Sequence, residues 1–385
     1  MIVYYIYFNI LLLLSVFEDF YKKNKVLDFL AYTITIFFIG FRYQLGTDWY
    51  HYKNNFNMID SINKFFIFGN NIITKDVESG FSIFMSFVKS LGVDFEYFTF
   101  IISLIYFLLL RTFFIKFNKK EILALILFLS FYMYKDFDLL KQMLAFGLCI
   151  YSLNYLKNKK KYFFFIFIAM LFHKTALIYI LFYFFYNKTT ITKKKLIFIF
   201  GCYFLIILFK IDFINIFITI LTKIDYFSKY IYLRGEYSFR GVDINFLINL
   251  FVFIIALLIK WDYNSNENIY LKMFTFNILI TLLSAGNTMI QIRLTNYFII
   301  SFVGIIITFY SRQKDIFSKL IVLLGIYGFI CAKEVYIFSK EPFRLAYTPY
   351  KNYFLKDYYN EEKLNEQFNR MKEEATKMYE KMESK

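Results

Sequence analysis

Apolar segments of membrane-spanning length recur along almost the whole chain. A helix needs ~20 mostly apolar residues to cross the hydrocarbon core of a bilayer. Because 59% of its 385 residues are hydrophobic, the chain carries more apolar surface than a soluble domain can cover. The sequence therefore predicts an all-α polytopic integral membrane protein with about 10–12 transmembrane helices. We expect spans at about 2–17, 26–41, 97–117, 121–137, 139–156, 196–221, 244–260, 270–290, 292–310 and 319–338.

Lysine-rich clusters flank the apolar segments and set the expected orientation. The net charge is +16, from 45 Lys and Arg residues against 29 Asp and Glu residues. In a membrane protein such an excess follows from basic residues in cytoplasmic loops, so we expect no nucleic-acid partner. The orientation leaves the N-terminus, the segment 42–96 and the loop 223–243 outside. The cytoplasmic clusters are expected at 22–25, 116–120, 157–161, 193–195 and 312–319.

The apolar stretch 162–186 is interrupted by His173, and basic loops flank it on both sides. A single span would place one of these loops outside. Each half has about 11 residues, or ~16 Å of helix, which is too short to cross a bilayer. We therefore expect a re-entrant hairpin with His173 at its tip, or two unusually short spans. Polar backbone at that depth requires a cavity lined by protein or water.

The C-terminal segment differs from the rest of the chain in being highly charged. Its apolar residues recur at alternating spacings of four and three, which is the heptad pattern of an amphipathic helix. We therefore expect a transmembrane domain at 1–350 and a helical tail at 355–385. Three roles stay open for this tail, namely binding to a partner helix, self-association and binding to the membrane surface. The residues of the heptad seam are Leu364, Phe368, Met371, Ala375, Met378 and Met382.

The strongest motif lies where the second span is expected to reach the outer face. Arg42, followed by Tyr43, offers a rigid guanidinium that suits phosphate oxygens. Thr47 and Asp48 can cap a following helix, which then carries Tyr52. Asp48 is also a candidate acceptor for the proton of a substrate hydroxyl. The same residues are also explained without a functional site, as an aromatic belt at the membrane interface with an arginine anchor and a helix cap.

Four further residues carry groups that are able to do chemistry. Glu78 is a second candidate carboxylate, or an acid that complements a helix dipole. Lys141 and Gln142 begin the segment 139–156, where a cation can attract a diphosphate or simply snorkel to the interface. His173 interrupts an apolar run, and a polar residue at such depth is a functional candidate. Its imidazole suits proton transfer or charge-assisted binding, and packing at a kink is the alternative.

Arginine is rare in the sequence, with eight positions, so its distribution is informative. Four of them, Arg42, Arg234, Arg240 and Arg293, fall in segments that are expected outside. This opposes the usual excess of positive charge in cytoplasmic loops, and an anionic ligand on the outer face explains it. The aromatic-rich loop around Arg234 and Arg240 can hold phosphate and stack sugars, or is simply a solvated loop.

Nothing in the sequence predicts a metal or a cofactor. The three cysteines lie in apolar runs without a CxxC spacing, which favours small packing residues. No nucleotide-sugar site is visible either. The first apolar run lacks a charged n-region and a cleavage site, so we expect it to be kept as a membrane helix.

These motifs resemble, in order, those of one family. Residues 42–52 are similar to the RYxxGTDYxxY signature of the EpsG family of exopolysaccharide polymerases. Residues 78–81 are similar to its ExGF element, and Lys141-Gln142-x-x-Ala145 to its RQxxA element. Lys141 stands where the family has arginine, and Trp49 where it has tyrosine. The first change keeps the charge and loses the bidentate fork.

The later part of the chain continues the resemblance, which covers roughly residues 1–350. Residues 172–178 are similar to the FHxSALI element of the family. Arg293 with Tyr297-Phe298 resembles a late RxxxYF element, and Pro349-Tyr350 resembles a C-terminal PY.

The resemblance implies a Wzy-like polymerase that joins oligosaccharide repeat units at the outer face of the cytoplasmic membrane. Donor and acceptor would both be oligosaccharides on undecaprenyl diphosphate. The tail beyond about 355 is not part of this resemblance, and its heptad seam leaves self-association and other proteins of polysaccharide assembly open as partners. Arginines would then hold the diphosphate, aromatic rings the sugars, and His173 with the carboxylates the proton. Two other functions stay open. A transporter of lipid-linked oligosaccharides needs access from both faces, and a membrane O-acyltransferase also fits a lone intramembrane histidine.

Overall fold

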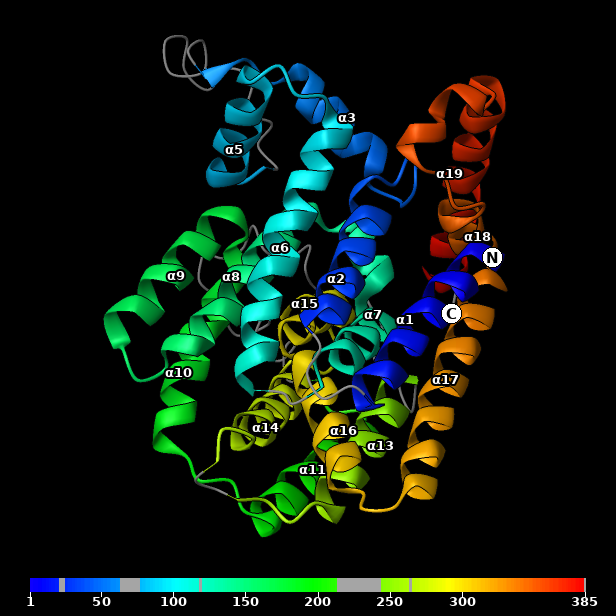
Figure 1. Cartoon of the computed structure of the whole chain (residues 1–385). Helices are drawn as coiled ribbons and strands as arrows, with labels where there is room; N and C mark the ends of the chain where they lie inside the picture. Colours follow the sequence, from blue (N-terminus) through cyan, green and yellow to red (C-terminus); the bar gives the residue numbers. More distant parts are fainter. Residues whose placement is uncertain (21–24, 63–76, 118–119, 213–243, 263–264, 384–385) are drawn as a thin grey trace, which may run out of the picture. The chain divides into compact units, whose positions relative to one another are not determined.

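The computed structural model describes the chain except for residues 21–24, 63–76, 118–119, 213–243, 263–264 and 384–385. The described residues fold into helices, and their single β-type pairing is a bridge between Arg42 and Asn352. This confirms the predicted all-α fold. The helices form two compact units (Figure 1), one from Met1–Leu177 with Phe317–Lys385 and one from Ile178–Ile316.

The first unit contains the long helices of the N-terminal half together with one late helix. Helix α2 packs between α6 and α1, α6 packs on α8, and α8 packs on α9. The bounds are α1 Ile2–Phe20, α2 Lys25–Gly40, α6 Phe95–Phe117, α7 Glu121–Asp138, α8 Leu140–Ser152 with the 3-10 turn η1 Leu153–Tyr155, α9 Lys159–Phe172 with the 3-10 turn η2 Lys174–Leu177, and α17 Ile316–Phe338.

Helix α7 is the centre of the first unit. Nearly all of its residues are buried, and it contacts α1, α2, α6 and α8. A helix that is apolar around its whole circumference is stable only when other helices cover it. Its last turn nevertheless carries Asp136 and Asp138. Helix α7 therefore brings two carboxylates to one end of the bundle.

Helix α17 has a single buried stripe along its length. Its buried residues Ile326, Ile330, Glu334 and Phe338 are spaced by four. The rest of the helix exposes large apolar side chains, which suits contact with lipid rather than water. These exposed residues include Ile316, Phe317, Leu320, Ile321, Leu324 and Val335.

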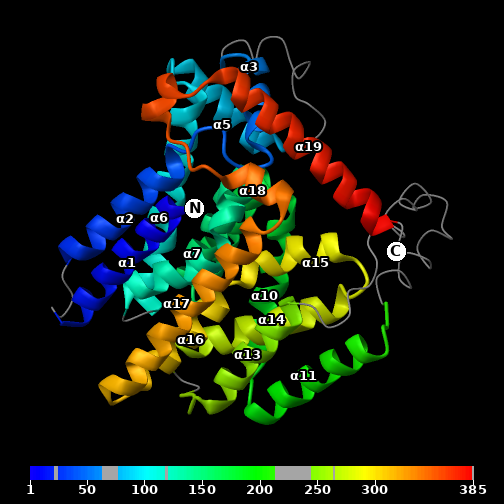
Figure 2. The same cartoon turned by 90° about the vertical axis from the view of Figure 1, so that its right-hand side faces the viewer.

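Further helices complete the first unit. Figures 1 and 2 both place α3, α5 and α19 at the end of the unit where α2 ends and α6 begins. Helix α3 packs on α5 and α6, α5 packs on α9, and α18 packs on α19. The first half of the heptad seam is used within the chain, because Leu364 and Met371 are buried. The bounds are α3 Trp49–Met58, α5 Ser79–Ser90, α18 Glu341–Tyr347, the 3-10 helix η5 Tyr353–Tyr358 and α19 Glu361–Glu383.

The second unit is built around α14. This helix contacts α10, α11, α15 and α16, and α16 also contacts α13. Twelve of the residues of α14 are buried, which again fits an apolar helix surrounded by others. The bounds are α10 Ile178–Lys188, α11 Lys193–Leu208, α13 Ile244–Leu258, α14 Asn268–Leu283, α15 Thr288–Thr295, the 3-10 turn η4 Asn296–Phe298 and α16 Ile300–Arg312.

Each predicted span overlaps a helix, and two spans are shorter than expected. Helix α11 ends at Leu208 rather than continuing toward 221, and Lys210 after it has a positive φ of 50°. Helix α14 ends at Leu283 rather than near 290, because Gly286 has a φ of +96° and Asn287 caps a new helix. A left-handed residue cannot continue a right-handed helix.

The apolar helices embed the chain in a membrane. Within the part of the chain that the structure describes, three helical segments are both long and apolar enough to cross it, namely Phe95–Phe117, Ile290–Arg312 and Ile316–Phe338. Further apolar helices are shorter, at Ile2–Glu18, Asn245–Leu258 and Asn268–Leu283. The number of crossings beyond these stays a prediction.

The predicted break at His173 is confirmed. Helix α9 ends at Phe172, His173 has extended backbone, and α10 begins at Ile178 after one 3-10 turn. The two halves have 14 and 11 residues, so each is about 16–21 Å long.

Candidate functional site

The loop that follows α2 is held by the C-terminal segment of the chain. The Tyr43 N–H donates to the Lys351 carbonyl at 2.9 Å, and the Gly46 N–H donates to the Ala346 carbonyl at 3.0 Å. We call residues 41–48 the signature loop. Both ends of the motif series therefore meet in space, because the loop lies beside the Pro349-Tyr350 segment.

Arg42 is fully buried beneath the signature loop. Its two terminal nitrogens donate to the carbonyls of Ile39 at 2.8 Å and Phe137 at 2.9 Å. Its guanidinium also lies over the Phe137 ring, 5.6 Å from the centroid. Burial lowers the pKa of Arg42 to about 10, while Asp138 and Asp136 favour its charged form, so it stays protonated at neutral pH. In this conformation Arg42 joins the loop to α2 and α7.

Gly46 and Asp138 fix the turn of the signature loop. Gly46 has a φ of +103°, and a Cβ there would stand 2.5 Å from Oδ1 of Asp138 and 2.9 Å from the Phe137 carbonyl oxygen. The same Oδ1 accepts the Thr47 N–H at 2.5 Å, and Oδ2 accepts the Tyr347 hydroxyl at 2.5 Å. Only glycine provides both the conformation and the space.

The remaining residues of the motif lie around the start of α3. Asp48 occupies the predicted N-cap position but makes no side-chain capping bond, and the Thr47 hydroxyl donates to it at 3.4 Å. Burial raises the pKa of Asp48, which the charges of His51 and Lys141 partly oppose. Tyr43 and Tyr52 are both buried.

The structure brings Glu78, Lys141 and His173 together as one hydrogen-bonded cluster. Glu78 Oε2 accepts the Lys141 ammonium at 2.8 Å, and Glu78 Oε1 is 3.0 Å from His173 Nδ1. The Glu78 and His173 side chains are 12% and 14% exposed, so the cluster is screened from water without being closed off. We call these three residues the acid–imidazole cluster. They come from the starts of α5 and α8 and from the end of α9.

Close packing of α5 against α9 explains how Glu78 reaches His173. A Cβ on Gly80 would stand 2.6 Å from the Leu171 Cβ and 2.7 Å from the Leu171 carbonyl oxygen. Glycine therefore lets the first turn of α5 touch the last turn of α9. The glycine of the ExGF element therefore has a steric role. Glu78, two residues before Gly80, meets the imidazole of His173, two residues after Leu171.

The charge state of Glu78 follows from this geometry. Burial raises the pKa of Glu78, but hydrogen bonds from His173 and Lys141 outweigh it and bring the pKa down to about 2. Glu78 is therefore ionised at neutral pH, and an ionised carboxylate only accepts hydrogen bonds. His173 must then carry a proton on Nδ1 when it bonds to Glu78.

The signature loop and the acid–imidazole cluster are neighbours within the first unit. The backbone of Lys141 is a hydrogen-bonding partner of the Tyr52 hydroxyl. Asp48 and Glu78 both raise the pKa of that hydroxyl, after the larger effect of burial. Tyr52 therefore connects the two parts of the candidate site.

The other predicted site residues are placed differently. Gln142 is buried in α8. Arg293 is exposed on α15, which belongs to the second unit. Arg234 and Arg240 lie outside the described residues. The structure therefore brings predicted residues of the first unit together. Of the four arginines expected outside, Arg42 belongs to the first unit, Arg293 belongs to the second, and the other two are not described.

The sequence argument missed Asp138 and Tyr347. Asp138 closes the signature loop, and Tyr347 anchors the C-terminal segment to that same carboxylate. Two acids in the last turn of an apolar segment, Asp136 and Asp138, are a signal for a polar function and could have been used. Nothing in the spacing of Tyr347 distinguishes it from the many other tyrosines.

The fold and the site define a polytopic helical membrane protein with a hydrogen-bonded carboxylate, imidazole and ammonium. The family model of the EpsG family matches residues 25–352, which cover most of the chain, and the chain belongs to this family. No curated protein and no solved structure matches the chain.

Proposed function

We propose that the protein is a polymerase of lipid-linked oligosaccharide repeat units at the outer face of the cytoplasmic membrane. The observation that carries the proposal is the acid–imidazole cluster, in which Glu78 holds His173 at 3.0 Å. Three motif elements of an exopolysaccharide family supply its residues, from α5, α8 and α9. Distant segments therefore converge on one arrangement that suits proton transfer.

In this proposal His173 is the general base and Glu78 orients it. Because Nδ1 donates to the ionised Glu78, the free electron pair of neutral His173 is on Nε2. A positioned base of this kind typically contributes ~10²–10⁴-fold to the rate. Glu78, with a pKa of about 2, is a weak base and is better suited to hold the imidazole. Asp48, with its raised pKa, is the alternative proton acceptor.

The reaction is a glycosyl transfer between two lipid-linked oligosaccharides. The hydroxyl of the acceptor sugar attacks the anomeric carbon of the donor and gives its proton to Nε2 of His173. A glycosidic C–O bond forms, the bond between the anomeric carbon and the diphosphate oxygen breaks, and undecaprenyl diphosphate leaves with both electrons of that bond. No redox partner and no nucleotide is required.

The diphosphate is negatively charged and needs cationic side chains, and the candidates differ in their exposure and in the bonds that they already make. Lys141 is partly exposed and bonded to Glu78, and Arg293 is exposed on α15. We propose Lys141 as a diphosphate contact in the first unit, because Arg42 already uses its terminal nitrogens on two carbonyls. Arg293, taken by itself, stays a proposed phosphate contact of the second unit. Arg42 then acts by holding the signature loop in place.

The test uses the purified full-length chain in lipid nanodiscs with an undecaprenyl-diphosphate-linked repeat unit and no other enzyme. A ladder of lipid-linked products that differ by one repeat unit is the expected result. Movement of the substrate between leaflets without a ladder would support a transporter instead. Transfer of acyl groups would support an O-acyltransferase. Either result in place of the ladder contradicts the proposal.

A further inference from the structure

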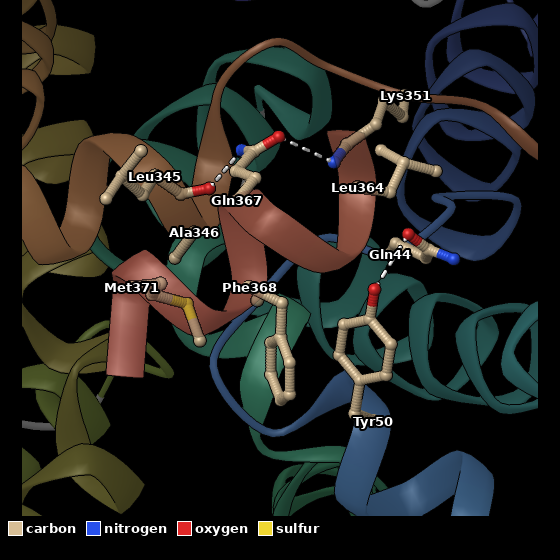
Figure 3. Close-up of a pocket in the computed structure, with 10 residues that line it drawn as sticks. Gln44, Tyr50, Leu345, Ala346, Lys351, Leu364, Gln367, Phe368 and Met371 are labelled. Atoms are coloured by element: carbon tan, nitrogen blue, oxygen red, sulfur yellow. Dashed lines mark hydrogen bonds between the residues drawn. The ribbon is translucent and has the colours of Figure 1, made fainter. Parts of the chain in front are cut away.

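A small pocket lies between the signature loop and the tail helix α19 (Figure 3). The space left free in it is only about 10 Å³, so its own side chains nearly fill it. The loop side contributes Gln44, Gly46 and Tyr50, and the chain after α17 contributes the rest. These other lining residues are Leu345, Ala346, Lys351, Leu364, Gln367, Phe368 and Met371. The pocket belongs entirely to the first unit.

The groups on the loop side have the chemistry that suits a sugar. The Tyr50 hydroxyl donates to the amide oxygen of Gln44 at 2.8 Å, which orients both side chains at the pocket wall. An aromatic ring can pack against the apolar face of a pyranose, and an amide can pair with its hydroxyls. Lys351 adds a buried ammonium, and burial lowers its pKa to about 8.

The Lys351 ammonium is poorly satisfied where it stands. It donates to the amide oxygen of Gln367 at 3.3 Å, a long hydrogen bond, although an ammonium has three donors. A buried charge of this kind gains from further acceptor oxygens, and sugar hydroxyls or acidic sugar groups supply them. The pocket therefore favours a ligand rich in oxygen with one apolar face.

Side chains of α19 occupy the place of such a ligand. The Phe368 ring lies on Tyr50 with a centroid distance of 3.9 Å, as a sugar ring would (Figure 3). The Gln367 oxygen accepts from Lys351, as a sugar hydroxyl would. With Phe368 in position, no space is left on that face of Tyr50 for a ligand.

Helix α19 packs on α18 and buries few of its own side chains. The Gln367 amide nitrogen donates to the carbonyl of Leu345 in α18 at 2.5 Å and to that of Thr348, just after α18, at 2.9 Å. Leu364 and Met371 are the buried apolar residues of its described side chains, and the opposite face is charged and exposed. A segment with few buried contacts opens at low free-energy cost. Helix α19 also lies beyond the family match, which ends at residue 352.

We propose that the pocket is a carbohydrate subsite of the polymerase and that α19 is its gate, closed in this structure. This inference rests on the proposed function. A repeat-unit sugar displaces Phe368 and Gln367 from the pocket, and α19 moves away. The apparent affinity for the sugar is then reduced by the fraction of molecules in which the gate is open.

The first experiment measures hydrogen exchange of the full-length protein in nanodiscs. The probe is the free oligosaccharide released by mild acid from lipid-linked repeat units of the producing cells. We expect the amides of residues 361–377 to exchange faster with the oligosaccharide present. Tyr50→Ala should abolish that response. Unchanged exchange in the unmodified protein would overturn the gate, whether or not the protein makes polymer.

The second experiment compares KM of gate variants in the polymerisation assay. Phe368→Ala removes one aromatic contact, so KM should fall by about two- to tenfold. Gln367→Ala, the second variant, should shift KM in the same direction, and Asn369→Ala on the exposed face is the matched control. An unchanged or higher KM for both gate variants contradicts the gate. Polymer formation by the unmodified protein shows in the same assay that the proposed function stands.

Discussion

The signature loop and the acid–imidazole cluster are neighbours, but their side chains are used in opposite ways. The loop has the most specific sequence motif, and its arginine is fully buried and bonded to two backbone carbonyls. The cluster comes from shorter motifs, and its side chains stay partly exposed around an ionised Glu78. The difference teaches that the strongest motif builds the support, while weaker motifs supply the groups that stay partly exposed.

Arg42→Ala should have the largest effect, because it destroys the support. It leaves the carbonyls of Ile39 and Phe137 unpaired in a buried place, at about 1–3 kcal/mol each. We expect a clear fall in melting temperature in detergent together with complete loss of activity. Arg42→Lys should also fail, because one ammonium cannot reproduce the planar fork.

Arg293→Ala is the matched comparison for this prediction. Arg293 is exposed, so its removal should change stability by no more than about 0.5 kcal/mol. Loss of a charge contact to the reacting diphosphate should still lower activity by ~10²-fold or more. A stable and active Arg42→Ala protein would reverse the assignment of support and chemistry.

His173→Gln should remove the chemistry and spare the fold. Glutamine can still donate to Glu78 but cannot take a proton at neutral pH. We expect activity to fall ~10²–10⁴-fold with an unchanged melting temperature. The pH profile of the unmodified enzyme sharpens the test. Activity should rise from acid to neutral pH for a base, and should fall for a cation that binds phosphate.

Gly80→Ala should move Glu78 away from His173 in the acid–imidazole cluster. The added Cβ meets the Leu171 backbone at 2.7 Å, so α5 must move away from α9. A shift of about 1 Å can cost ~10²-fold in rate. Gly325→Ala is the control, because no atom lies within 4 Å of a Cβ there. Equal activity of the two variants would mean that the Glu78 to His173 contact is not needed.

Glu78→Gln should reveal the ion pair as a pH-dependent part of stability. The pKa of Glu78 is lowered from 4.5 to about 2 in the folded protein. Its contribution, on the order of 3 kcal/mol, is therefore fully present above pH 4.5 and is lost as pH falls through about 2. The difference in unfolding free energy between the two proteins should shrink over that window. Glu366→Gln on the exposed face of α19 should show no such change.

Lys141→Arg should have the smallest effect. A guanidinium can keep the bond to Glu78 Oε2, now 2.8 Å long, and restores the residue that the family resemblance predicts. We expect activity and stability within about 0.5 kcal/mol of the unmodified protein, roughly twofold in rate. Complete loss of activity would show that the site is built around lysine.

Much of the fold could be predicted from the sequence because it depends on local patterns. The length of the apolar runs located the helices, and the polar interruption at His173 located the break between α9 and α10. The heptad spacing predicted α19. Helix ends were less certain where one residue decides them, as at Gly286 with its positive φ.

Contacts between distant segments could be decided only by the tertiary structure. Glu78 and His173 are 95 residues apart, and their bond depends on α5 and α9 touching at Gly80. The burial of Arg42 depends on the Phe137 carbonyl at the end of α7, and no spacing in the sequence encodes it. The sequence by itself determined that the chain is a helical membrane protein with these polar residues. The packing of helices decided which of them are buried in support of the loop and which stay partly exposed, because burial and hydrogen bonding are properties of neighbours in space.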